Sequence, residues 1–588
     1  MQENKQRTKQ NHSRRYLITR LGAYLAEHKV LLLAAFVMMI VSNLLALAGP
    51  ALSGLAIDEI SRKTGVNFEG VYFYCILMIA VYVISALLSY ALTVVMTAVT
   101  KRVTYAMRRD VFEHLSKLPV SYYDTNQTGD IISRISYDID TINASLSNDV
   151  LQIGASAITV IGSFVMMCTI NVPLLSVFAI TVPITVLFTK HKTSKVQPLF
   201  KKRSASLGRL NGYAEEMMSG LRTIKVYGNE KNVTDRFDFF NKEAVDSYYE
   251  ADYQACIVGP SVNFINNLSM TLVSLLGSLL YLGRLISLGN ISSFILYSRK
   301  FSGPINEFAN ILSELQSAFA AADRMFTLLD EPTEPEDAED AELLVSPKGE
   351  VSIENVDFSY DKKRDIIKDF SMDIAPGKVV AIVGHTGAGK TTIINLLMRF
   401  YDPDRGRILI DGKDIQKLTR RSLRQSFTMV LQDTWLFSGT VFENIAYGRE
   451  GATLEDVKNA ARSAKIDRFI ENLPDGYDTL LSDDGQGISK GQKQLLTIAR
   501  AMLNDSHLLI LDEATSNVDS RTEMQISDAM QRLMKGKTCF IIAHRLSTVK
   551  NADIIIVMGD GKICEAGTHK QLLEKKGHYF DIYNSQFK

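Results

Sequence analysis

The sequence has no excess of charge of either sign: its 588 residues include 65 basic and 65 acidic ones. A formal net charge of zero gives no electrostatic reason to expect nucleic acid as a partner, because such binding depends on neutralising phosphates. Cysteines are also few, and the five present lack the paired spacing of a metal site or a disulfide framework. The cysteines therefore give no indication of a fold held together by disulfides or a metal ion, and we expect them to be packing residues.

Charged residues are missing from five long apolar runs in the first half of the chain. A helix needs roughly 20 apolar residues to cross a bilayer, and one charge at its centre costs about 2.5–3.5 kcal/mol. Each run therefore predicts a membrane-spanning helix, and five such runs rarely coexist in a soluble fold. The runs are 30–57, 71–100, 151–170, 172–189 and 256–283.

A sixth apolar run begins near Ile291 but contains Arg299 and Lys300, followed by Pro304. Two placements are open for these cations: the membrane surface, if the helix is shifted, or a water-filled cavity, where intramembrane charge is tolerated. The amides of Asn263 and Asn266 in the fifth run could line the same cavity or join helices by hydrogen bonds.

Basic residues are distributed unevenly between the connections. Seven Lys or Arg precede the first run, six lie between the second and third, and twelve between the fourth and fifth. The opposite connections carry only Arg62, Lys63 and Arg284. Because basic loops stay on the cytoplasmic side, both termini are predicted to be cytoplasmic. The two long basic connections have helical periodicity, so we expect short docking elements at their turns, around 119–129 and 214–228.

The pattern changes after an acidic, proline-containing linker. A strand-like run over 378–383 leads into Gly384-His385-Thr386-Gly387-Ala388-Gly389-Lys390-Thr391, which matches G-x-x-x-x-G-K-[ST]. In this motif backbone N–H groups surround phosphates, the lysine reaches the β- and γ-phosphates, and the hydroxyl of Thr391 reaches Mg²⁺. The helix that follows, expected over 391–399, points its positive end at the same anion.

A second apolar run, 508–511, ends in two carboxylates. It is typical of a central parallel strand buried on both faces. Asp512 at its end suits coordination of Mg²⁺, and Glu513 suits polarising the attacking water. His544 follows another apolar strand and could contact the γ-phosphate.

With these motifs in place, the chain resembles an ABC exporter half-transporter, in which six membrane helices are fused to one ATP-binding domain. The resemblance covers all but about the first 15 residues, with motifs in the family's order. It implies that Tyr360 stacks on adenine and that Gln432 touches Mg²⁺ and senses the membrane domain. It also implies that residues 516–519 form the D-loop, that 488–492 replace the signature LSGGQ, and that 119–129 resemble the first coupling helix.

The implied nucleotide-binding residues are Tyr360, Gly384, His385, Thr386, Gly387, Ala388, Gly389, Lys390, Thr391, Thr392, Ser489, Gly491, Gln492 and Asp519. The implied magnesium ligands are Thr391, Gln432 and Asp512, and the catalytic residues are Glu513, His544 and Gln432.

Lys490 departs from this pattern, since it stands where the signature has glycine. In this family each ATP is held between the Walker motifs of one domain and the signature of the other. An altered signature beside intact Walker residues resembles one subunit of heterodimeric bacterial multidrug exporters. We therefore expect Lys490 to face a non-hydrolytic ATP of the partner, with neutral variation in a homodimer as the alternative.

Together these features predict a helical six-span transmembrane domain followed by an α/β P-loop ATPase domain. The expected boundaries are a cytoplasmic segment 1–28, a transmembrane domain 29–322, a linker 323–349 and an ATP-binding domain 350–588. The expected activity is export of small amphipathic compounds across the cell membrane, driven by ATP and Mg²⁺, in a dimer with a second half-transporter. Lipid or peptide export and a non-pumping ATP-gated regulator are the alternatives.

Overall fold

The computed structural model describes the backbone of residues 12–62, 65–432, 434–481, 487–512, 519–542 and 549–585. It describes the side chains of all of these except 305, 306, 308–310 and 520. Its contacts divide the chain into two compact units. The helical unit comprises Met1–Lys117 and Asn126–Glu331, and the sheet unit comprises Leu118–Thr125 and Pro332–Lys588.

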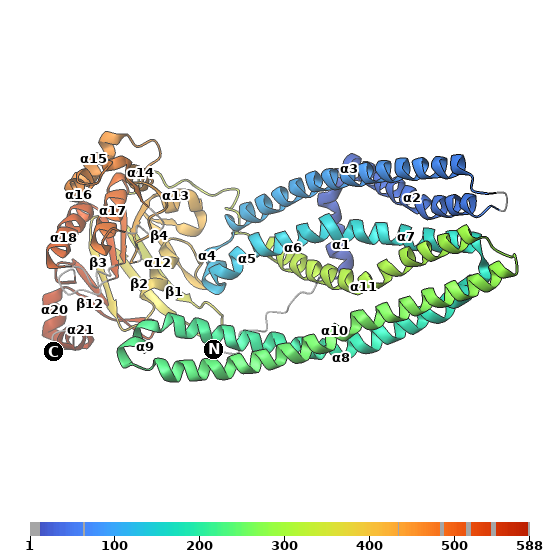
Figure 1. The fold of residues 1–588 in the computed structure, drawn as a ribbon. Helices are drawn as coiled ribbons and strands as arrows, with labels where there is room; N and C mark the ends of the chain where they lie inside the picture. The colour runs from blue at the N-terminus through green and yellow to red at the C-terminus, as the bar shows by residue number, and fades with distance from the viewer. Residues whose placement is uncertain are drawn as a thin grey trace. The chain divides into compact units, whose positions relative to one another are not determined.

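The helical unit is built from long helices, with the longest spanning 53 residues (Figure 1). Some of its helices begin where a side chain caps the first turn. Asn67 accepts a hydrogen bond from the N–H of Gly70, Asn171 from Leu174 and Ser287 from Asn290. The elements are α1 (Arg14–Ala26), α2 (Lys29–Ile60), α3 (Phe68–Leu115), α5 (Thr128–Ser133), η1 (Arg134–Asp138), α6 (Ile139–Ala144), η2 (Ser145–Asp149), α7 (Val150–Ile170), α8 (Val172–Ser219), α9 (Leu221–Tyr227), α10 (Glu230–Leu282) and α11 (Leu288–Leu329).

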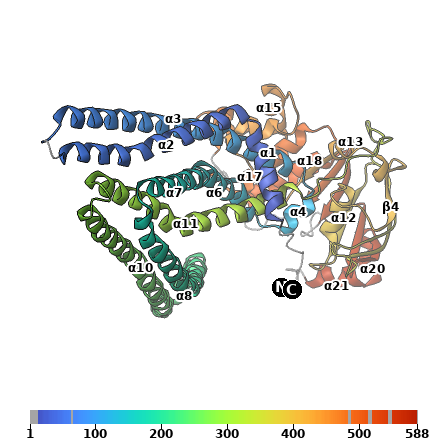
Figure 2. The same cartoon turned by 90° about the vertical axis from the view of Figure 1, so that its right-hand side faces the viewer.

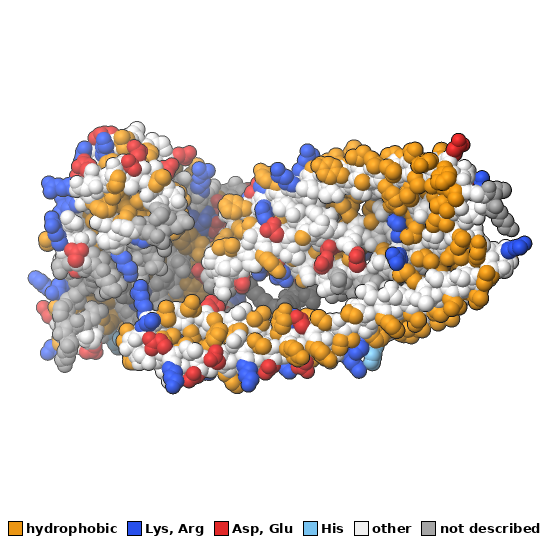
Figure 3. Space-filling view, viewed as in Figure 1, with side chains coloured by type: hydrophobic (Ala, Val, Ile, Leu, Met, Phe, Trp, Pro, Cys, Tyr) orange, Lys and Arg blue, Asp and Glu red, His pale blue; other side chains and the backbone are white. Residues whose placement is uncertain are grey.

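Within the described residues, five helical stretches are long and apolar enough to cross a membrane: Lys29–Ile60, Phe68–Leu115, Thr128–Ile170, Val172–Ser219 and Glu230–Leu282. They contain the five charge-free runs. Large apolar side chains are exposed along them, among them Phe73, Ile76 and Leu87 on α3. Figure 3 shows hydrophobic side chains gathered over α2 and α3, and charged ones over the part of α8 and α10 near α9. The sixth predicted span lies in α11, a continuous helix of 42 residues, and its crossing stays a prediction.

Polar side chains join α2 to α11 inside the helical unit. The hydroxyls of Ser293 and Tyr297 donate to the carbonyls of Pro50 and Leu47, at 2.8 and 2.6 Å. The backbones also approach closely, since a Cβ at Gly54 would lie 2.0 Å from Ser293 Oγ and 2.6 Å from the carbonyl oxygen of Gly289. Only glycine allows this approach. These bonds replace water that a bilayer cannot supply.

The two predicted docking regions contain short helices. The first holds α4 (Val120–Thr125), which belongs to the sheet unit although the chain enters and leaves it from the helical unit. The second holds α9, which ends at Gly228, whose φ of 59° is the left-handed conformation that glycine adopts most readily at a helix end.

The sheet unit contains a six-stranded sheet in the order β12-β11-β3-β10-β9-β6 and a four-stranded sheet in the order β2-β1-β4-β5 (Figures 1 and 2). The strands β11, β3, β10, β9 and β6 are parallel, and β12 is antiparallel at the edge. The strands are β1 (Val351–Phe358), β2 (Ile367–Ile374), β3 (Val379–Gly384), β4 (Arg405–Ile410), β5 (Lys413–Asp414), β6 (Phe427–Val430), β7 (Gly439–Thr440), β8 (Leu480–Leu481), β9 (Leu508–Asp512), β10 (Thr538–Ile542), β11 (Ile554–Gly559) and β12 (Lys562–Gly567).

Helices cover this unit's sheets, and the parallel strands are buried on both faces. Residues alternate between two cores: Phe540 belongs to the same core as Ile393 of α12, whereas Ile541 belongs to the same core as Leu496 of α17. That alternation explains why these strands are continuous apolar runs. The helices are α12 (Lys390–Leu397), α13 (Arg420–Gln425), α14 (Val441–Ala446), α15 (Leu454–Ser463), α16 (Asp467–Glu471), α17 (Lys490–Leu503), α18 (Ser520–Met534), α20 (His569–Lys575) and α21 (His578–Ser585), with short 3-10 turns η3 (Ile415–Lys417) and η4 (Gly476–Asp478).

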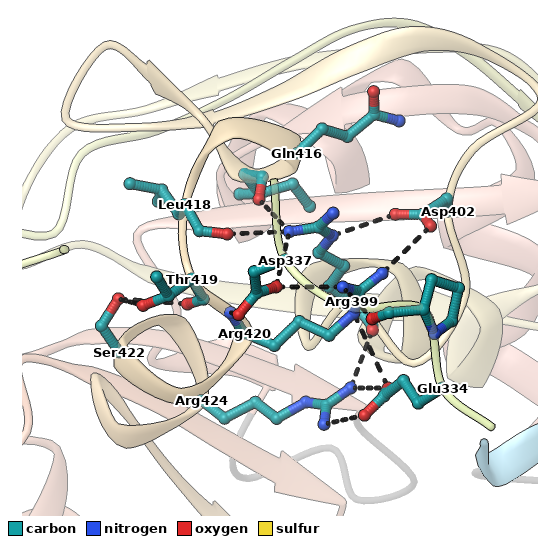
Figure 4. A network of polar contacts seen from close by, with 12 residues as sticks. Glu334, Asp337, Arg399, Asp402, Gln416, Leu418, Thr419, Arg420, Ser422 and Arg424 are labelled. Atoms are coloured by element: carbon teal, nitrogen blue, oxygen red, sulfur yellow. Dashed lines mark hydrogen bonds and ion pairs between the residues drawn. The ribbon is translucent and has the colours of Figure 1, made fainter. Parts of the chain in front are cut away.

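The linker is ordered by ion pairs rather than by helix or strand. Helix α11 continues to Leu329, so the first residues of the predicted linker are helical. Beyond them, the Glu334 carboxylate accepts two hydrogen bonds from Arg424 (Figure 4). The Asp337 carboxylate accepts two from Arg420, one from its backbone N–H and one from its guanidinium, both at 3.0 Å. Acidic side chains of the linker therefore form ion pairs with arginines of the sheet unit.

Candidate functional site

The predicted site residues follow the carboxyl ends of neighbouring parallel strands. The described strands β3, β10, β9 and β6 end at Gly384, Ile542, Asp512 and Val430. Because parallel strands end at the same edge of a sheet, this edge gathers the glycine-rich loop, Asp512 and Gln432. Glu513 and His544, which follow two of these strands in sequence, lie outside the described residues, as do 516–518.

The glycine-rich loop has the backbone that its sequence predicts. Gly387 and Gly389 have φ values of 85° and 98°, which side chains rarely adopt. A Cβ at Gly384 would lie 2.4 Å from the carbonyl oxygen of Met558 on β11. The loop then enters α12 at Lys390, so backbone N–H groups and the helix N-terminus share one concavity, as an anion site requires.

Lys390 closes the loop on itself. Its ammonium donates to the carbonyl oxygens of Gly384 at 2.7 Å and His385 at 3.1 Å, and its side chain is buried. Burial lowers the pKa of Lys390, and the negative charge of Asp512 opposes that shift. An ammonium held beside the loop by two carbonyl oxygens can exchange them for phosphate oxygens.

The other loop residues differ in exposure. His385, Thr386 and Gly387 are exposed, whereas Ala388 and Gly389 are buried against the sheet. Thr391 at the first turn of α12 is exposed. The exposed residues outline the surface that a nucleotide's phosphates would contact, and the buried ones fix the turn.

Tyr360 lies beside α12 with its ring half exposed. Its hydroxyl donates to the Thr392 hydroxyl at 3.2 Å and accepts from the Asn395 amide at 3.3 Å. The ring of Tyr401 packs edge-on against it, with 5.0 Å between centroids. The exposed ring can take a base by stacking, which aromatic side chains favour.

The magnesium ligands expected from the sequence are all oxygen donors: the hydroxyl of Thr391, the carboxylate of Asp512 and the amide of Gln432. The described residues contain no group of three or more His, Cys, Asp or Glu side chains able to hold a metal. Mg²⁺ does not need such a cage, because one or two carboxylates plus nucleotide phosphates suffice. The donor set therefore fits Mg²⁺, which would neutralise phosphate charge when bound.

The altered signature forms the start of α17. Ser489 is the N-cap: its hydroxyl accepts the N–H of Gln492 at 3.3 Å, and the Gln492 side chain accepts the N–H of Ser489 at 2.9 Å. Lys490 is the first helical residue and is exposed, whereas Gly491 is buried. Lys490 is absent from the residues with positive φ. The helical backbone at this position therefore accepts lysine without strain.

Asp519 caps another helix. Its carboxylate accepts the backbone N–H groups of Arg521 at 3.1 Å and Thr522 at 3.0 Å at the start of α18. The hydrogen bond from Thr522 is the main cause that lowers the pKa of Asp519. This residue therefore orients α18 within its own chain.

The hydrogen bond between Tyr401 and Asp124 was not predicted from the sequence. The hydroxyl of Tyr401 donates to the Asp124 carboxylate of α4 at 2.7 Å, inside the sheet unit. Burial and this hydrogen bond raise the pKa of Tyr401. Because the Tyr401 ring also contacts Tyr360, one side chain touches both the expected adenine-stacking ring and α4. The signal available in the sequence was an aromatic residue shortly after the P-loop helix.

Comparison with known proteins identifies the family. The sequence matches the family described as ABC transporter transmembrane region over residues 32–305 and the family described as ABC transporter over residues 367–516. The chain belongs to the ABC transporters: it is an ABC exporter with a helical transmembrane domain followed by an ATPase domain, and its transport is driven by ATP.

Three similar proteins show how closely the chain is related to other ABC transporters. The chain is 42% identical to the uncharacterized ABC transporter ATP-binding protein YfiC of Bacillus subtilis, over 97% of this chain and 94% of that protein. It is 43% identical to a fatty acid ABC transporter ATP-binding/permease protein of Mycobacterium bovis, over 88% and 82%. A solved bacterial Atm1-family ABC exporter with ATP bound is similar at 29% identity and a TM-score of 0.76, covering 95% of this chain and 98% of that chain.

Proposed function

We propose that this chain is one subunit of a heterodimeric exporter that moves amphipathic compounds across the bacterial plasma membrane, with both termini in the cytoplasm. The observation that carries the proposal is the start of α17. An exposed ammonium stands at the helix N-terminus that would face the partner's nucleotide, while Lys390 and Asp512 of this chain are present at the sheet edge. Such an arrangement makes the two ATP sites of a dimer unequal.

In this proposal each residue has one task. The glycine-rich loop and Lys390 bind the phosphates, Tyr360 stacks on the base, and Asp512, Thr391 and Gln432 bind Mg²⁺. Glu513 accepts a proton from the attacking water, and His544 holds the γ-phosphate. Ser489, Gly491 and Gln492 bind the partner's ATP, and Asp519 of the D-loop adds a further contact to nucleotide. Closure of the two ATPase domains around ATP then changes the access of the membrane cavity.

Lys490 makes the two ATP sites of the dimer different because of the charge and size of its side chain, not because of its backbone conformation. A glycine at the first helical position leaves room for a phosphate to approach the N–H groups, whereas lysine adds a long stem with an ammonium that can bind the same phosphate tightly. Tight binding of ATP without turnover suits a site that holds the dimer together, because catalysis needs contacts that strengthen only in the transition state.

The test is ATP hydrolysis in lipid by this chain alone and with the product of the neighbouring gene. We expect the pair to be active and the chain alone to retain at most about a tenth of that rate. In the pair, Glu513→Gln should lower turnover at least about 100-fold, whereas Lys490→Gly should change it less than about threefold. Brisk hydrolysis by the chain alone as a dimer would refute the heterodimer.

Export of a lipid is the second candidate for the transported compound. It is favoured by the relative that is named a fatty acid transporter. The two candidates are distinguished by the rate of ATP hydrolysis by the pair: a lipid should accelerate it if lipid is exported, and other amphipathic compounds should accelerate it if they are exported.

The contact between Tyr401 and Asp124 leads to a prediction about coupling. Tyr401→Phe removes the hydroxyl but keeps the ring against Tyr360, so ATP affinity should change little. A hydrogen bond to a charged group is worth about 1.5–3 kcal/mol, so hydrogen exchange in residues 120–125 should rise at least about 10-fold. Tyr447→Phe is the matched control, because that exposed hydroxyl forms no hydrogen bond in the described part of the chain. Equal exchange in both variants would show that Tyr401 does not hold α4.

A further inference from the structure

The helical unit encloses a cavity of about 960 Å³ between α7, α8, α10 and α11. This volume lies at the upper end of the roughly 300–1,000 Å³ typical of small-molecule sites. The cavity is therefore large enough for a ligand with a long hydrocarbon chain. All four helices belong to the helical unit, so this chain contributes lining residues from four of its own helices.

The walls of the cavity differ in chemistry. The walls from α7, α10 and α11 are mainly aliphatic, with Ala157 and Val160, Val258 and Val262, and Ile311 and Leu312 as examples. The wall from α8 is mainly polar. It presents Thr185, Thr189, Lys190 and Thr193. A ligand that fills the cavity thus meets hydrocarbon on three sides and a polar strip on the fourth.

Among the side chains that the structure describes, Lys190 is the one charged group that lines the cavity. It forms no ion pair with any described residue, whereas Lys202 and Arg203 farther along α8 pair with Glu250 and Asp252 of α10. Glu307 lies between two lining residues of α11 but does not line the cavity, and its carboxylate accepts the Gln152 amide at 2.7 Å. Helix α8 carries no acidic residue before Glu215. The cavity therefore has a net positive charge at one wall.

The position of Lys190 matters as well as its charge. It directly follows the charge-free run 172–189, so it stands where that run leaves the hydrocarbon of a bilayer. An amphiphile lying in the cytoplasmic leaflet has its headgroup at this level and its chain at the depth of the apolar walls.

We propose that this cavity binds a single-chain amphiphile with an anionic headgroup, with the headgroup on Lys190 and the chain against α7, α10 and α11. The inference rests on the proposed export of amphipathic compounds and names the charge of the compound. Lys190 repels a cationic headgroup and gives a neutral one no ion pair, so it selects by charge. Thr189 and Thr193, on the same wall, add hydroxyl donors for the headgroup.

The test is equilibrium binding of dodecanoate to the pair of subunits in nanodiscs without nucleotide, with binding to protein-free nanodiscs subtracted. At about pH 8.5 this carboxylate is ionised, and dodecanol and dodecylammonium supply the neutral and cationic heads. We expect dodecanoate to bind about 10-fold more tightly than dodecanol, and Lys190→Ala to remove that preference while leaving dodecanol binding unchanged. Lys190→Glu should reverse the order in favour of dodecylammonium.

Lys192→Ala is the matched control, since Lys192 lies on the same helix, forms no ion pair with the described residues and does not line the cavity. If Lys192→Ala weakens dodecanoate binding as much as Lys190→Ala, surface charge alone recruits the anion and the proposal fails. Equal binding of dodecanoate and dodecanol to the unmodified pair also overturns it. Binding with the expected selectivity but without ATP-dependent export would instead refute the proposed function and leave this site standing.

Discussion

Replacing Lys390 by methionine is expected to lower ATP hydrolysis by the exporter at least about 100-fold, since the loss of one positioned donor to developing charge typically costs about 100–1,000-fold. The ammonium is already held at the loop by the carbonyl oxygens of Gly384 and His385. Methionine fills the same space without a donor, so the fold should persist while phosphate binding is lost. The measurement is the rate of phosphate release by the reconstituted pair.

A thermal measurement separates lost binding from lost folding. Trp435 is the only tryptophan of the chain and lies in the ATPase domain, so its fluorescence follows unfolding of that domain alone. ATP at about 100 times its dissociation constant should stabilise the unmodified domain by about 2.7 kcal/mol, and this gain should vanish in Lys390→Met. Lys378→Ala is the control, because that lysine forms a solvent-exposed pair with Asp553. Retention of more than half of the hydrolysis rate in Lys390→Met would contradict the assignment.

Arg399→Ala is expected to lower the free energy of unfolding of the ATPase domain by about 3 kcal/mol, because two buried carbonyl acceptors lose a charged donor. Arg399 is only 8% exposed. Its guanidinium donates to the carbonyls of Ile415 at 3.0 Å and Leu418 at 2.8 Å and to the Asp402 carboxylate at 3.1 Å (Figure 4). Alanine would leave all three acceptors without this donor.

Two further variants make the prediction about Arg399 specific. Arg399→Lys should recover less than half of the loss, because an ammonium cannot reproduce the planar fork that reaches three acceptors. Arg407→Ala should leave the unfolding temperature unchanged, since Arg407 pairs with Glu354 on an exposed surface. Unfolding is followed by Trp435 fluorescence in the full chain. An Arg399→Ala domain as stable as the Arg407→Ala domain would show that the buried network does not contribute to stability.

The sequence predicted those elements whose conformation depends on consecutive residues, such as the P-loop and the apolar strands. The glycines of the P-loop needed positive φ values, and Gly387 and Gly389 have them. The run 508–511 was expected as a central strand buried on both faces and the run before His544 as another apolar strand, and both have strand neighbours on each side in the parallel sheet. In these cases the signal lies in consecutive residues, because periodicity and backbone demands are read along the chain.

Lys490 shows where a local rule was insufficient. Lysine stands where the signature has glycine, yet the position is the first residue of a helix and Lys490 does not have a positive φ. Backbone strain depends on the φ that the fold imposes, and the fold starts a helix there because Ser489 caps it. What Lys490 does must therefore be argued from the group that it faces.

The sequence by itself determined that this chain has charge-free helices long enough for a bilayer, a phosphate-binding loop after a buried strand, and motifs in the order of an ABC exporter. Only the tertiary structure decided that Tyr401 holds Asp124, that Arg399 bonds to segments on both sides of β4, and that Lys190 lines an apolar cavity without an acidic partner among the described residues. The reason is physical: hydrogen bonds and ion pairs between residues far apart in sequence depend on distances that folding sets, and composition or periodicity carries no record of those distances.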